Sequence, residues 1–319
     1  MPKEYKETYM RKTTTLDDHP IVEGYDFEKD FDIQKFLDSY NNTGFQATNL
    51  GKAISIAKTM QREKVTTYLS MTGNVISSGL REIITYLVKH KYIDVIITTA
   101  SGVEEDIIKS LSDFKIGHFE TPGKLLFEHG VGRIGNLFVP NDRYLELEKF
   151  INQTFKELPS DLTPSGIARH IGSKLDNKSY LYWAYKNNIP VYCPGIVDGS
   201  LGDLAFFEKQ RNKKLKIDVM SDHQKLINHV LNQEKTGALI LGGGIAKHYL
   251  LNANIFRDGL DYAIYLNTAD EAYGSDSGGN EEEAKTWAKI NINGQHVKVK
   301  ADFTITLPLL IAGAYKCKK

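Results

Sequence analysis

The sequence predicts an α/β protein in which helices cover both faces of a doubly wound parallel sheet. Short apolar runs typical of strands alternate with helical stretches through most of the chain. Loops rich in small residues follow several of these strands, where doubly wound proteins bind ligands. With 319 residues and 41% hydrophobic content, we expect a single large domain over residues 36–319. Residues 1–35 are polar and lack periodicity, so they are predicted to form a flexible N-terminal arm.

The predicted elements follow one another in a regular order. A strand at Val65–Met71 precedes a helix at Gly79–His90, and a strand at Tyr92–Thr99 precedes a helix at Val103–Phe114. Further strands are predicted at Ile189–Cys193, Leu215–Met220, Ala238–Leu241 and Tyr262–Leu266. Ser221 and Gln224 match a capping box that opens a helix over Asp222–Gln233. The apolar run Phe303–Tyr315 is predicted to be a buried strand or helix, because it is too short to span a bilayer.

The composition argues against several classes of protein. Forty basic residues balance forty acidic ones, so no global charge steers the chain to nucleic acid or to an anionic membrane. The two cysteines, Cys193 and Cys317, are too few for a disulfide framework, and the nine histidines lack the spacing of a zinc site. We therefore expect no metal. The N-terminus has no apolar signal segment, which favours a cytoplasmic location.

Four loops of small residues follow predicted strands. Gly242-Gly243-Gly244 comes directly after Ala238–Leu241 and opens a helix, where free backbone N–H groups favour a ligand's phosphates. This triplet does not fit the G-x-G-x-x-G fingerprint, and a tight turn without a ligand is an equal alternative. The other loops span residues 74–79, 98–105 and 198–203. In the last of them, Asp198 is placed to bind ribose hydroxyls, and Asp203 either binds a cationic amine or caps a helix.

A second constellation surrounds Lys289. The stretch from Gly274 to Lys289 combines carboxylates, an indole and an amine after a glycine-rich turn. A polyamine requires carboxylates for its ammonium groups and an aromatic face for its methylene chain, and a lysine amine acts as a nucleophile through a Schiff base. A solvated acidic helix start is the simpler alternative. The run 289–292 favours an extended strand, with Trp287 and Lys289 facing one pocket, whereas a helix puts Glu283 and Trp287 on one face.

His248 is the candidate proton acceptor. It lies in the first turns of the helix that follows the triple glycine, where the positive end of the helix dipole favours a neutral imidazole. A lone histidine is more often structural, so this role depends on its neighbours.

These residues belong to a longer set of recognisable blocks. The blocks are Asn74–Arg81, Thr98–Ile108, Arg133–Pro140, Asp198–Asp203, Leu241–Asn254 and Tyr262–Ile290, and Val297–Leu310 continues the series. Together they resemble deoxyhypusine synthase, from about Val65 to Leu310. The combination of Gly-Gly-Gly-x-x-Lys-His, Gly-Ser-Asp-Ser-Gly and Trp-x-Lys is more specific than a nucleotide motif. The resemblance implies a Rossmann-like sheet, in agreement with the alternation of strands and helices.

The resemblance implies an NAD-dependent aminobutyltransferase. Members of that family dehydrogenate spermidine with NAD, release 1,3-diaminopropane, and hold the aminobutyl group as an imine on a lysine. They then pass it to a lysine of the precursor of the hypusine-containing translation initiation factor. On this resemblance Lys289 forms the imine and His248 transfers protons, while the polyamine is bound by Asp203, Asp276, Glu283 and Trp287. The NAD contacts carried over are Asn74, Ser77, Thr99, Ala100, Glu104, Asp198, Gly243, Thr268, Ala269, Ser277 and Asp302. Members are homotetramers with sites at subunit interfaces.

Two other functions stay open, and the chain departs from the family pattern in places. A homospermidine synthase-like aminobutyltransferase would keep the same catalytic set, and a catalytically silent NAD-binding protein would keep the fold alone. Ser101 stands where the family has a glycine, Tyr273 replaces an acidic residue, and Gly279-Asn280-Glu281 replaces Ala-Arg-Pro. The phenol of Tyr273 cannot supply the charge of a carboxylate to a cofactor.

Overall fold

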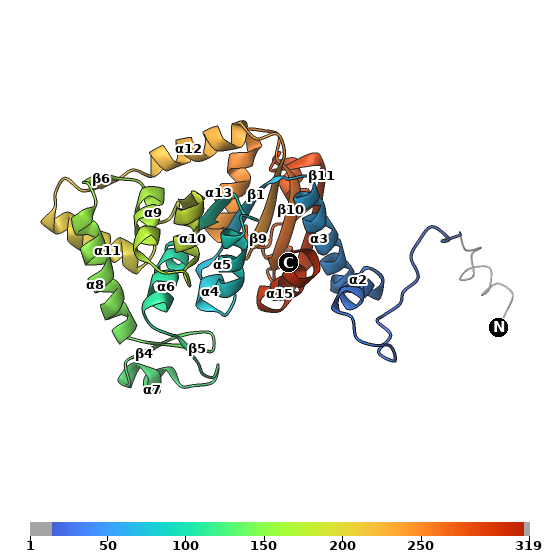
Figure 1. The fold of residues 1–319 in the computed structure, drawn as a ribbon, viewed down its shortest axis with the longest axis horizontal. Helices are drawn as coiled ribbons and strands as arrows, with labels where there is room; N and C mark the ends of the chain where they lie inside the picture. Colours follow the sequence, from blue (N-terminus) through green and yellow to red (C-terminus); the bar gives the residue numbers. More distant parts are fainter. Residues whose placement is uncertain (1–14, 316–319) are drawn as a thin grey trace.

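Six parallel strands form the central sheet of the protein (Figure 1). The structure is a computed structural model that describes residues 15–315. The strands are β1 (Thr66–Met71), β2 (Val95–Thr98), β7 (Val191–Tyr192), β9 (Thr236–Leu241), β10 (Leu260–Asn267) and β11 (Ile290–Lys300). Their order is β11-β10-β9-β1-β2-β7, and every neighbouring pair is parallel. The chain builds outward from β1 through β2 to β7 and then returns to β9 on the other side, so the strand order reverses between β1 and β9.

Helices cover both faces of this sheet (Figure 1). One face packs against α3 (Phe45–Arg62), α5 (Arg81–Lys89), α6 (Ala100–Leu111) and α15 (Phe303–Ala314). The other face packs against α12 (Val219–Leu231), α13 (Gly244–Ile255) and α14 (Glu281–Thr286). Side chains alternate between the faces along each strand: Leu69 and Met71 belong to the first core, Tyr68 to the second. The predicted fold class is confirmed.

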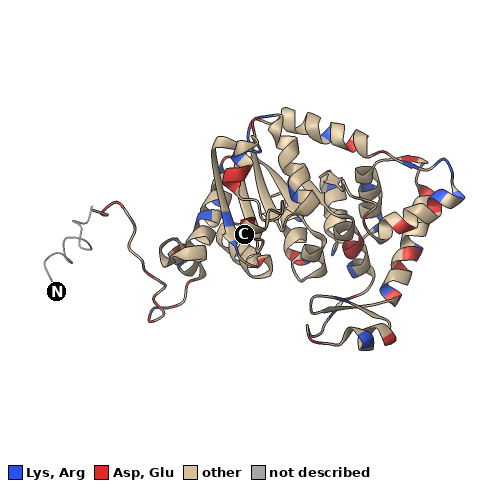
Figure 2. Cartoon of the chain, turned by 180° about the vertical axis from the view of Figure 1, so that it is seen from behind, with Lys and Arg blue, Asp and Glu red and all other residues tan. Residues whose placement is uncertain are grey.

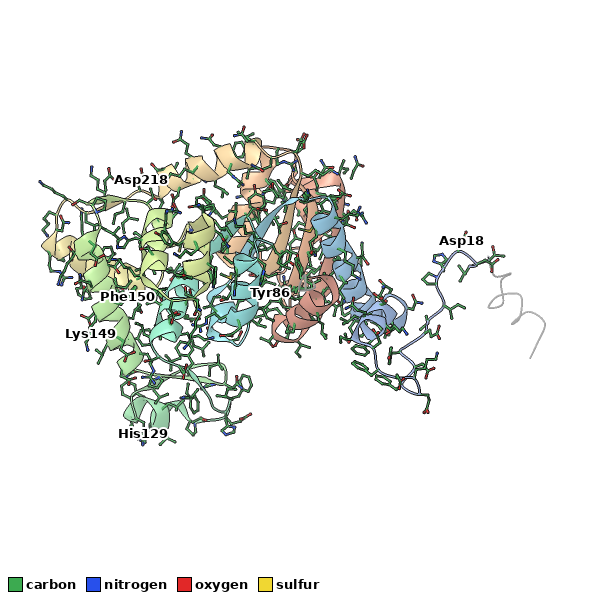
Figure 3. The ribbon with its side chains drawn as sticks, viewed as in Figure 1. Asp18, Tyr86, His129, Lys149, Phe150 and Asp218 are labelled. Atoms are coloured by element: carbon green, nitrogen blue, oxygen red, sulfur yellow. The ribbon has the colours of Figure 1, made fainter. Side chains whose placement is uncertain are left out.

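The remaining elements lie around the sheet. They are α2 (Ile33–Thr43), α4 (Gly73–Ser77), α8 (Asp142–Glu157), α9 (Pro164–Lys174), α10 (Tyr180–Asn187), α11 (Ser200–Arg211) and the 3₁₀ turn η1 (Glu271–Tyr273). A small antiparallel sheet of β3 (Lys115–Ile116), β5 (Leu137–Pro140) and β4 (Val131–Ile134) projects from the body together with α7 (Gly123–Glu128), which His129 follows (Figure 3). β6 (Asp161–Leu162) pairs in parallel with β8 (Lys216–Ile217), away from the central sheet.

The described N-terminal segment lies outside the main body. Residues 15–32 contain no helix or strand and are almost entirely exposed, and Asp18 lies well away from the sheet (Figure 3). Regular structure begins with α2 at Ile33, close to the predicted boundary at residue 35. The division into arm and domain stays a prediction. Residues 1–14 of the predicted arm and Cys317 lie outside the described part of the chain.

Three local predictions need correction or completion. The strand predicted at Leu215–Met220 is limited to β8, because α12 already begins at Val219. The cap of α12 is Asp218 rather than Ser221: the Asp218 carboxylate accepts hydrogen bonds from the backbone N–H groups of Met220 and Ser221, at 2.9 Å and 3.0 Å. The C-terminal apolar run is a helix, α15, which tolerates Pro308 in its interior.

Charge is spread over the molecule rather than gathered in one field. Figure 2 shows Lys and Arg interspersed with Asp and Glu over most elements, as the balanced composition predicts. Within residues 15–315, no helix is both long and apolar enough to cross a bilayer.

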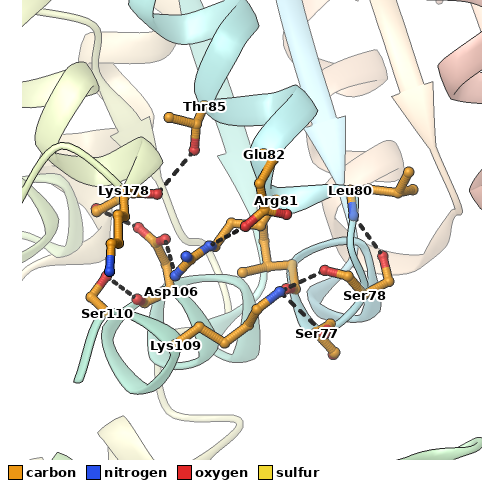
Figure 4. A network of polar contacts seen from close by, with 12 residues as sticks. Ser77, Ser78, Leu80, Arg81, Glu82, Thr85, Asp106, Lys109, Ser110 and Lys178 are labelled. Carbon is orange, nitrogen blue, oxygen red and sulfur yellow. Dashed lines mark hydrogen bonds and ion pairs between the residues drawn. The ribbon is translucent and has the colours of Figure 1, made fainter. Parts of the chain in front are cut away.

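Buried carboxylates lie at the start of α6, beneath the loop that follows β2. Glu104, Glu105 and Asp106 are all buried there. Asp106 accepts hydrogen bonds from the Ser179 hydroxyl at 2.6 Å and the Leu181 N–H at 3.1 Å, and lies 3.9 Å from Arg81 (Figure 4). It therefore joins α6 to α5 and to the start of α10. The Ser77 hydroxyl donates to Glu105, and burial raises the pKa of Glu105 to about 7.

We predict that replacing Glu105 changes how stability depends on pH. Because its pKa in the folded protein lies above the ordinary value of 4.5, the folded state keeps a proton that the unfolded chain loses as pH rises from about 4.5 to 7. Stability from this group is therefore full below that window and is lost through it. Glu105→Gln, which still accepts from Ser77, should make the decline shallower in denaturant unfolding at several pH values. Burial also raises the pKa of Asp106, so Asp106 makes stability decline with rising pH as well, and part of the decline should remain in the variant.

The exposed Glu28→Gln serves as the matched control for that measurement. It should leave the pH dependence as in the parent protein. An identical slope for Glu105→Gln and the parent would contradict the prediction.

Candidate active site

All predicted site residues except Glu283, Trp287 and Lys289 lie in segments that follow strands at one edge of the sheet, because all six strands are parallel and their carboxyl ends lie together. Asn74 and Ser77 follow β1; Thr99, Ala100 and Glu104 follow β2; Asp198 and Asp203 follow β7; Gly243 and His248 follow β9; Thr268, Ala269, Asp276 and Ser277 follow β10; Asp302 follows β11. The four small-residue loops singled out in the sequence are therefore neighbours in space, as predicted.

A cavity of about 350 Å³ lies where the strand order reverses. Its lining residues are Thr72, Asn74, Gly242, Gly243, Asn267, Thr268, Ala269, Ser277, Asp302 and Phe303. Six of these were predicted as cofactor contacts: Asn74, Gly243, Thr268, Ala269, Ser277 and Asp302. We call this space the strand-end cavity.

The triple glycine forms one wall of the strand-end cavity. Gly242 and Gly244 have φ values of +85° and +62°, which residues other than glycine rarely adopt. A Cβ at Gly243 would come within 2.6 Å of Ser277, so the two loops touch there. The N–H of Gly244, the first residue of α13, donates to the Ser277 hydroxyl at 3.0 Å. This wall offers backbone N–H groups at a helix start, which suits a phosphate or another anion.

A buried carboxylate joins the loops after β2 and β7. Glu104 accepts a hydrogen bond from the N–H of Leu201 at 2.7 Å, at the start of α11. Burial raises the pKa of Glu104, and the nearby Asp203 and Asp198 raise it further. Asp198 and Asp203 are themselves exposed. This side of the edge therefore holds three carboxylates, an environment that favours a cationic or hydroxyl-bearing ligand.

Lys247 links the glycine-rich turn after β10 to α13. It is 3% exposed, and its ammonium donates to the carbonyl of Asp276 and, at 2.9 Å, to that of Gly279. Burial lowers the pKa of Lys247, whereas the nearby Asp276 and Glu283 raise it. The Glu283 carboxylate lies 3.2 Å from where a Cβ on Gly279 would be. Two of the predicted polyamine contacts therefore lie beside one buried cation.

Lys289 lies ahead of β11, which starts at the opposite edge of the sheet from the strand-end cavity. Its side chain is half-buried. The extended conformation predicted for this segment is wrong before Ile290. Trp287 ends α14, Ala288 has a φ of +52°, and the Lys289 N–H donates to the Ala284 carbonyl at 3.0 Å, so a helix end occupies these positions. Trp287 is 64% exposed.

His248 is exposed on α13 and contacts Asn252 one turn later. The Asn252 amide nitrogen lies 3.1 Å from Nδ1 of His248. Because an amide NH₂ group only donates, this contact makes Nδ1 the acceptor and leaves the proton on Nε2. Sequence reasoning missed Asn252, although its i,i+4 spacing from His248 was a usable signal. Glu105 and Lys247 lie in recognised blocks of the sequence, but their contacts were not predicted, because these contacts form between separate elements.

The positions that depart from the family pattern make contacts of their own. The Ser101 and Thr99 hydroxyls lie 2.9 Å apart. Asn280 caps α14, because its side chain accepts from the Glu283 N–H at 2.8 Å, and it donates to Glu271 at 2.6 Å. Tyr273 is 84% exposed. Within residues 15–315, no group of three or more His, Cys, Asp or Glu side chains is arranged to hold a metal ion.

Comparison with known proteins places this site in a family. A model of the deoxyhypusine synthase family matches residues 35–314. The chain is 44% identical to the deoxyhypusine synthase of Senecio vernalis, over 93% of this chain and 90% of the relative. It is 42% identical to the homospermidine synthase of Senecio vulgaris, with 93% and 90% covered. A solved structure from Entamoeba histolytica, provisionally assigned as a deoxyhypusine synthase, is 29% identical, with a TM-score of 0.67 over 93% of this chain and 98% of that one.

The family match includes all six strands of the central sheet and every predicted site residue. The chain therefore belongs to the deoxyhypusine synthase family of enzymes.

Proposed function

We propose that this protein is an NAD-dependent deoxyhypusine synthase. It would transfer the 4-aminobutyl group of spermidine to a lysine of the precursor of the hypusine-containing translation initiation factor and release 1,3-diaminopropane. One observation supports the proposal besides family membership: a single loop after β10 carries neighbouring residues that contact both the glycine wall and the cluster around Lys247. Its Ser277 contacts the glycine wall of the strand-end cavity, and its neighbour Asp276 lies beside Lys247 and Glu283.

The strand-end cavity has the features that a dinucleotide requires. Gly243 lets the loop after β10 close against the glycine wall through Ser277, and the start of α13 offers N–H groups for the phosphates of the dinucleotide. Asn74, Thr268, Ala269 and Asp302 would hold the remainder, with Ser77, Thr99, Ala100, Glu104 and Asp198 along the loops after β1, β2 and β7. When bound, NAD supplies a hydride acceptor and later returns the hydride.

The residues of this chain handle the polyamine and its protons. Asp203, Asp276 and Glu283 would each pair with an ammonium group, while Trp287 lies along the methylene chain. The amine of Lys289 would attack the carbon made electrophilic by oxidation and displace 1,3-diaminopropane, so that the aminobutyl group becomes an imine on Lys289. His248 has the geometry to move a proton at Nε2, because Asn252 occupies Nδ1.

A site at a subunit interface would reconcile two features of the single chain. Lys289 does not line the strand-end cavity of its own chain, and Trp287, His248 and Asp203 are exposed on it. The homotetramer expected from the resemblance would bring Lys289 of one subunit to the cavity of another. A cytoplasmic location accompanies this proposal, since its acceptor is a translation factor.

We predict that Lys289→Arg abolishes covalent capture of the substrate. A guanidinium stays protonated and cannot form an imine. Incubated with NAD and spermidine, the parent protein should release 1,3-diaminopropane and form an adduct trapped by borohydride. The variant should form no adduct and release product at least about 100-fold more slowly. The control Lys285→Arg, on the short helix α14 that precedes Lys289, should keep the adduct. Absence of adduct and of product with the parent protein would contradict the proposed function and favour a silent NAD-binding protein.

We predict that two inactive variants restore activity when their subunits are mixed. Gly243→Ala should distort the strand-end cavity by pushing Ser277 away from the glycine wall, because its Cβ would meet Ser277, and Lys289→Arg removes the proposed nucleophile. If each site takes Lys289 and the cavity from different subunits, a mixed pair contains one intact site, so about a quarter of parental activity should return. Subunits exchanged under mild denaturant provide the test. Mixtures as inactive as each variant alone would show that one chain builds the whole site.

The acceptor is the second point to decide, since a homospermidine synthase is 42% identical to this chain. That enzyme name favours a polyamine acceptor as the alternative. With the factor precursor and putrescine supplied together, we expect aminobutyl transfer to the protein lysine to dominate. Mass spectrometry of the precursor and chromatography of the polyamines measure the two products. Faster formation of homospermidine would make the alternative the correct assignment.

A further inference from the structure

A half-buried lysine holds the first wall of the strand-end cavity, which is formed by α4 with Asn74. Lys109, on α6, directs its ammonium at the end of α4 and donates to the carbonyls of Ile76 at 2.8 Å, Ser77 at 3.3 Å and Ser78 at 2.6 Å (Figure 4). A helix of five residues cannot satisfy its own last carbonyls. An ammonium has three donors and is favoured at a helix C-terminus. Lys109 therefore satisfies the carbonyls that α4 leaves open.

Two lysines hold the opposite wall in the same way. Lys298, on β11, donates to the carbonyl of Gly278 at 2.6 Å. Lys247, on α13, donates to the carbonyls of Asp276 and Gly279. The turn over residues 275–279 is otherwise closed by few bonds of its own, such as those from the N–H groups of Gly278 and Gly279 to the Ser275 carbonyl, at 2.9 Å and 3.2 Å. Its position relative to the sheet therefore depends on these two ammonium groups.

We propose that Lys109, Lys247 and Lys298 are positioning residues, which fix the two walls of the strand-end cavity by donating to backbone carbonyls. None of the three lines the cavity. Lys247 is buried, and Lys109 and Lys298 are half-buried. Because a desolvated ammonium is costly unless its donors are used, each wall is favoured in the geometry that satisfies its lysines. Lys109 places Ser77 and Asn74, whereas Lys298 and Lys247 place Asp276 and Ser277. The turn over residues 275–279, which under the proposed function contacts both cofactor and polyamine, is thereby held in position by lysines from α13 and β11. None of its own side chains has to enter the core.

We call the hydrogen bonds from these three lysines to the backbone carbonyls of the two walls the lysine clamp. Hydrogen exchange of the full-length protein tests this clamp directly, independently of any activity. Lys109→Met should speed exchange of amides in residues 73–79 by about tenfold and leave residues 274–280 unchanged, because only the local opening equilibrium is altered. Lys298→Met should have the opposite pattern. Each variant is thus the control for the other. Lys235→Met, which removes a surface ion pair with Glu63, should change neither segment.

The affinity for NAD, which rests on the proposed function, provides a second readout. Both clamp variants should raise the dissociation constant about tenfold, as expected for loss of a charged hydrogen bond that orders a binding wall. Lys109→Arg and Lys298→Arg keep a donor cation and should recover part of the loss, and they replace the methionine variants if those fail to fold. If neither Lys109→Met nor Lys298→Met changed hydrogen exchange in residues 73–79 or 274–280, the proposed positioning role of these lysines would be wrong, whatever the activity. A parent protein that binds no NAD, with the exchange pattern as expected, would overturn the proposed function alone.

Discussion

The common direction of the six strands is the constraint on which the rest of the molecule depends. A parallel sheet forces every strand to end at the same edge, so six loops from distant parts of the sequence must share one surface. The chain reverses its strand order between β1 and β9, and the loops diverge there and leave a cavity. Glycine is required where the loops converge again: Gly242 and Gly244 take left-handed conformations, and Gly243 has no space for a side chain against Ser277.

Loops crowded at one edge leave many backbone groups without partners, and this chain satisfies them with side chains from neighbouring elements. Carboxylates serve the N–H groups, as Glu104 does for Leu201 and Asp106 for Leu181. Ammonium groups serve the carbonyls, as Lys109 does for the end of α4. Each bond crosses between two elements, so an edge made of short, irregular segments acquires a definite geometry. The cost is a set of buried charges, which explains why burial raises the pKa of Glu104, Glu105 and Asp106.

The sequence predicts the location of the site better than its local geometry. The strands β1, β9 and β10 are visible as apolar runs, and the small-residue loops after them are visible as motifs, so their meeting follows from the fold class alone. The cap of α12 was misplaced, because Ser221 and Asp218 are both competent caps and only the backbone decides between them. The extended conformation predicted before Ile290 was wrong for a related reason. Ile290–Ile292 has strand character, but Ala284 packs in the core, and the turn that ends α14 continues up to Lys289. Lys109 carries no motif that distinguishes it from a surface residue, and Lys247, although it belongs to the Gly-Gly-Gly-x-x-Lys-His motif, forms its contacts only when separate loops pack together.

The position of Lys289 bears on how such a site evolves its specificity. Lys289, which follows α14 and the exposed Trp287, does not line the strand-end cavity of its own chain. Under the proposed function, substitutions around α14, such as Asn280 capping the helix and bonding Glu271, would alter the proposed polyamine contacts while the glycine wall stays intact. Such a separation would be compatible with the different enzyme names of the two Senecio relatives, deoxyhypusine synthase and homospermidine synthase. The loop after β10 is the exception, because Asp276 and Ser277 are adjacent and are proposed to contact the polyamine and the cofactor respectively. This loop also receives ammonium donors from both α13 and β11, so the segment in which the two proposed functions meet is fixed to two elements of the core.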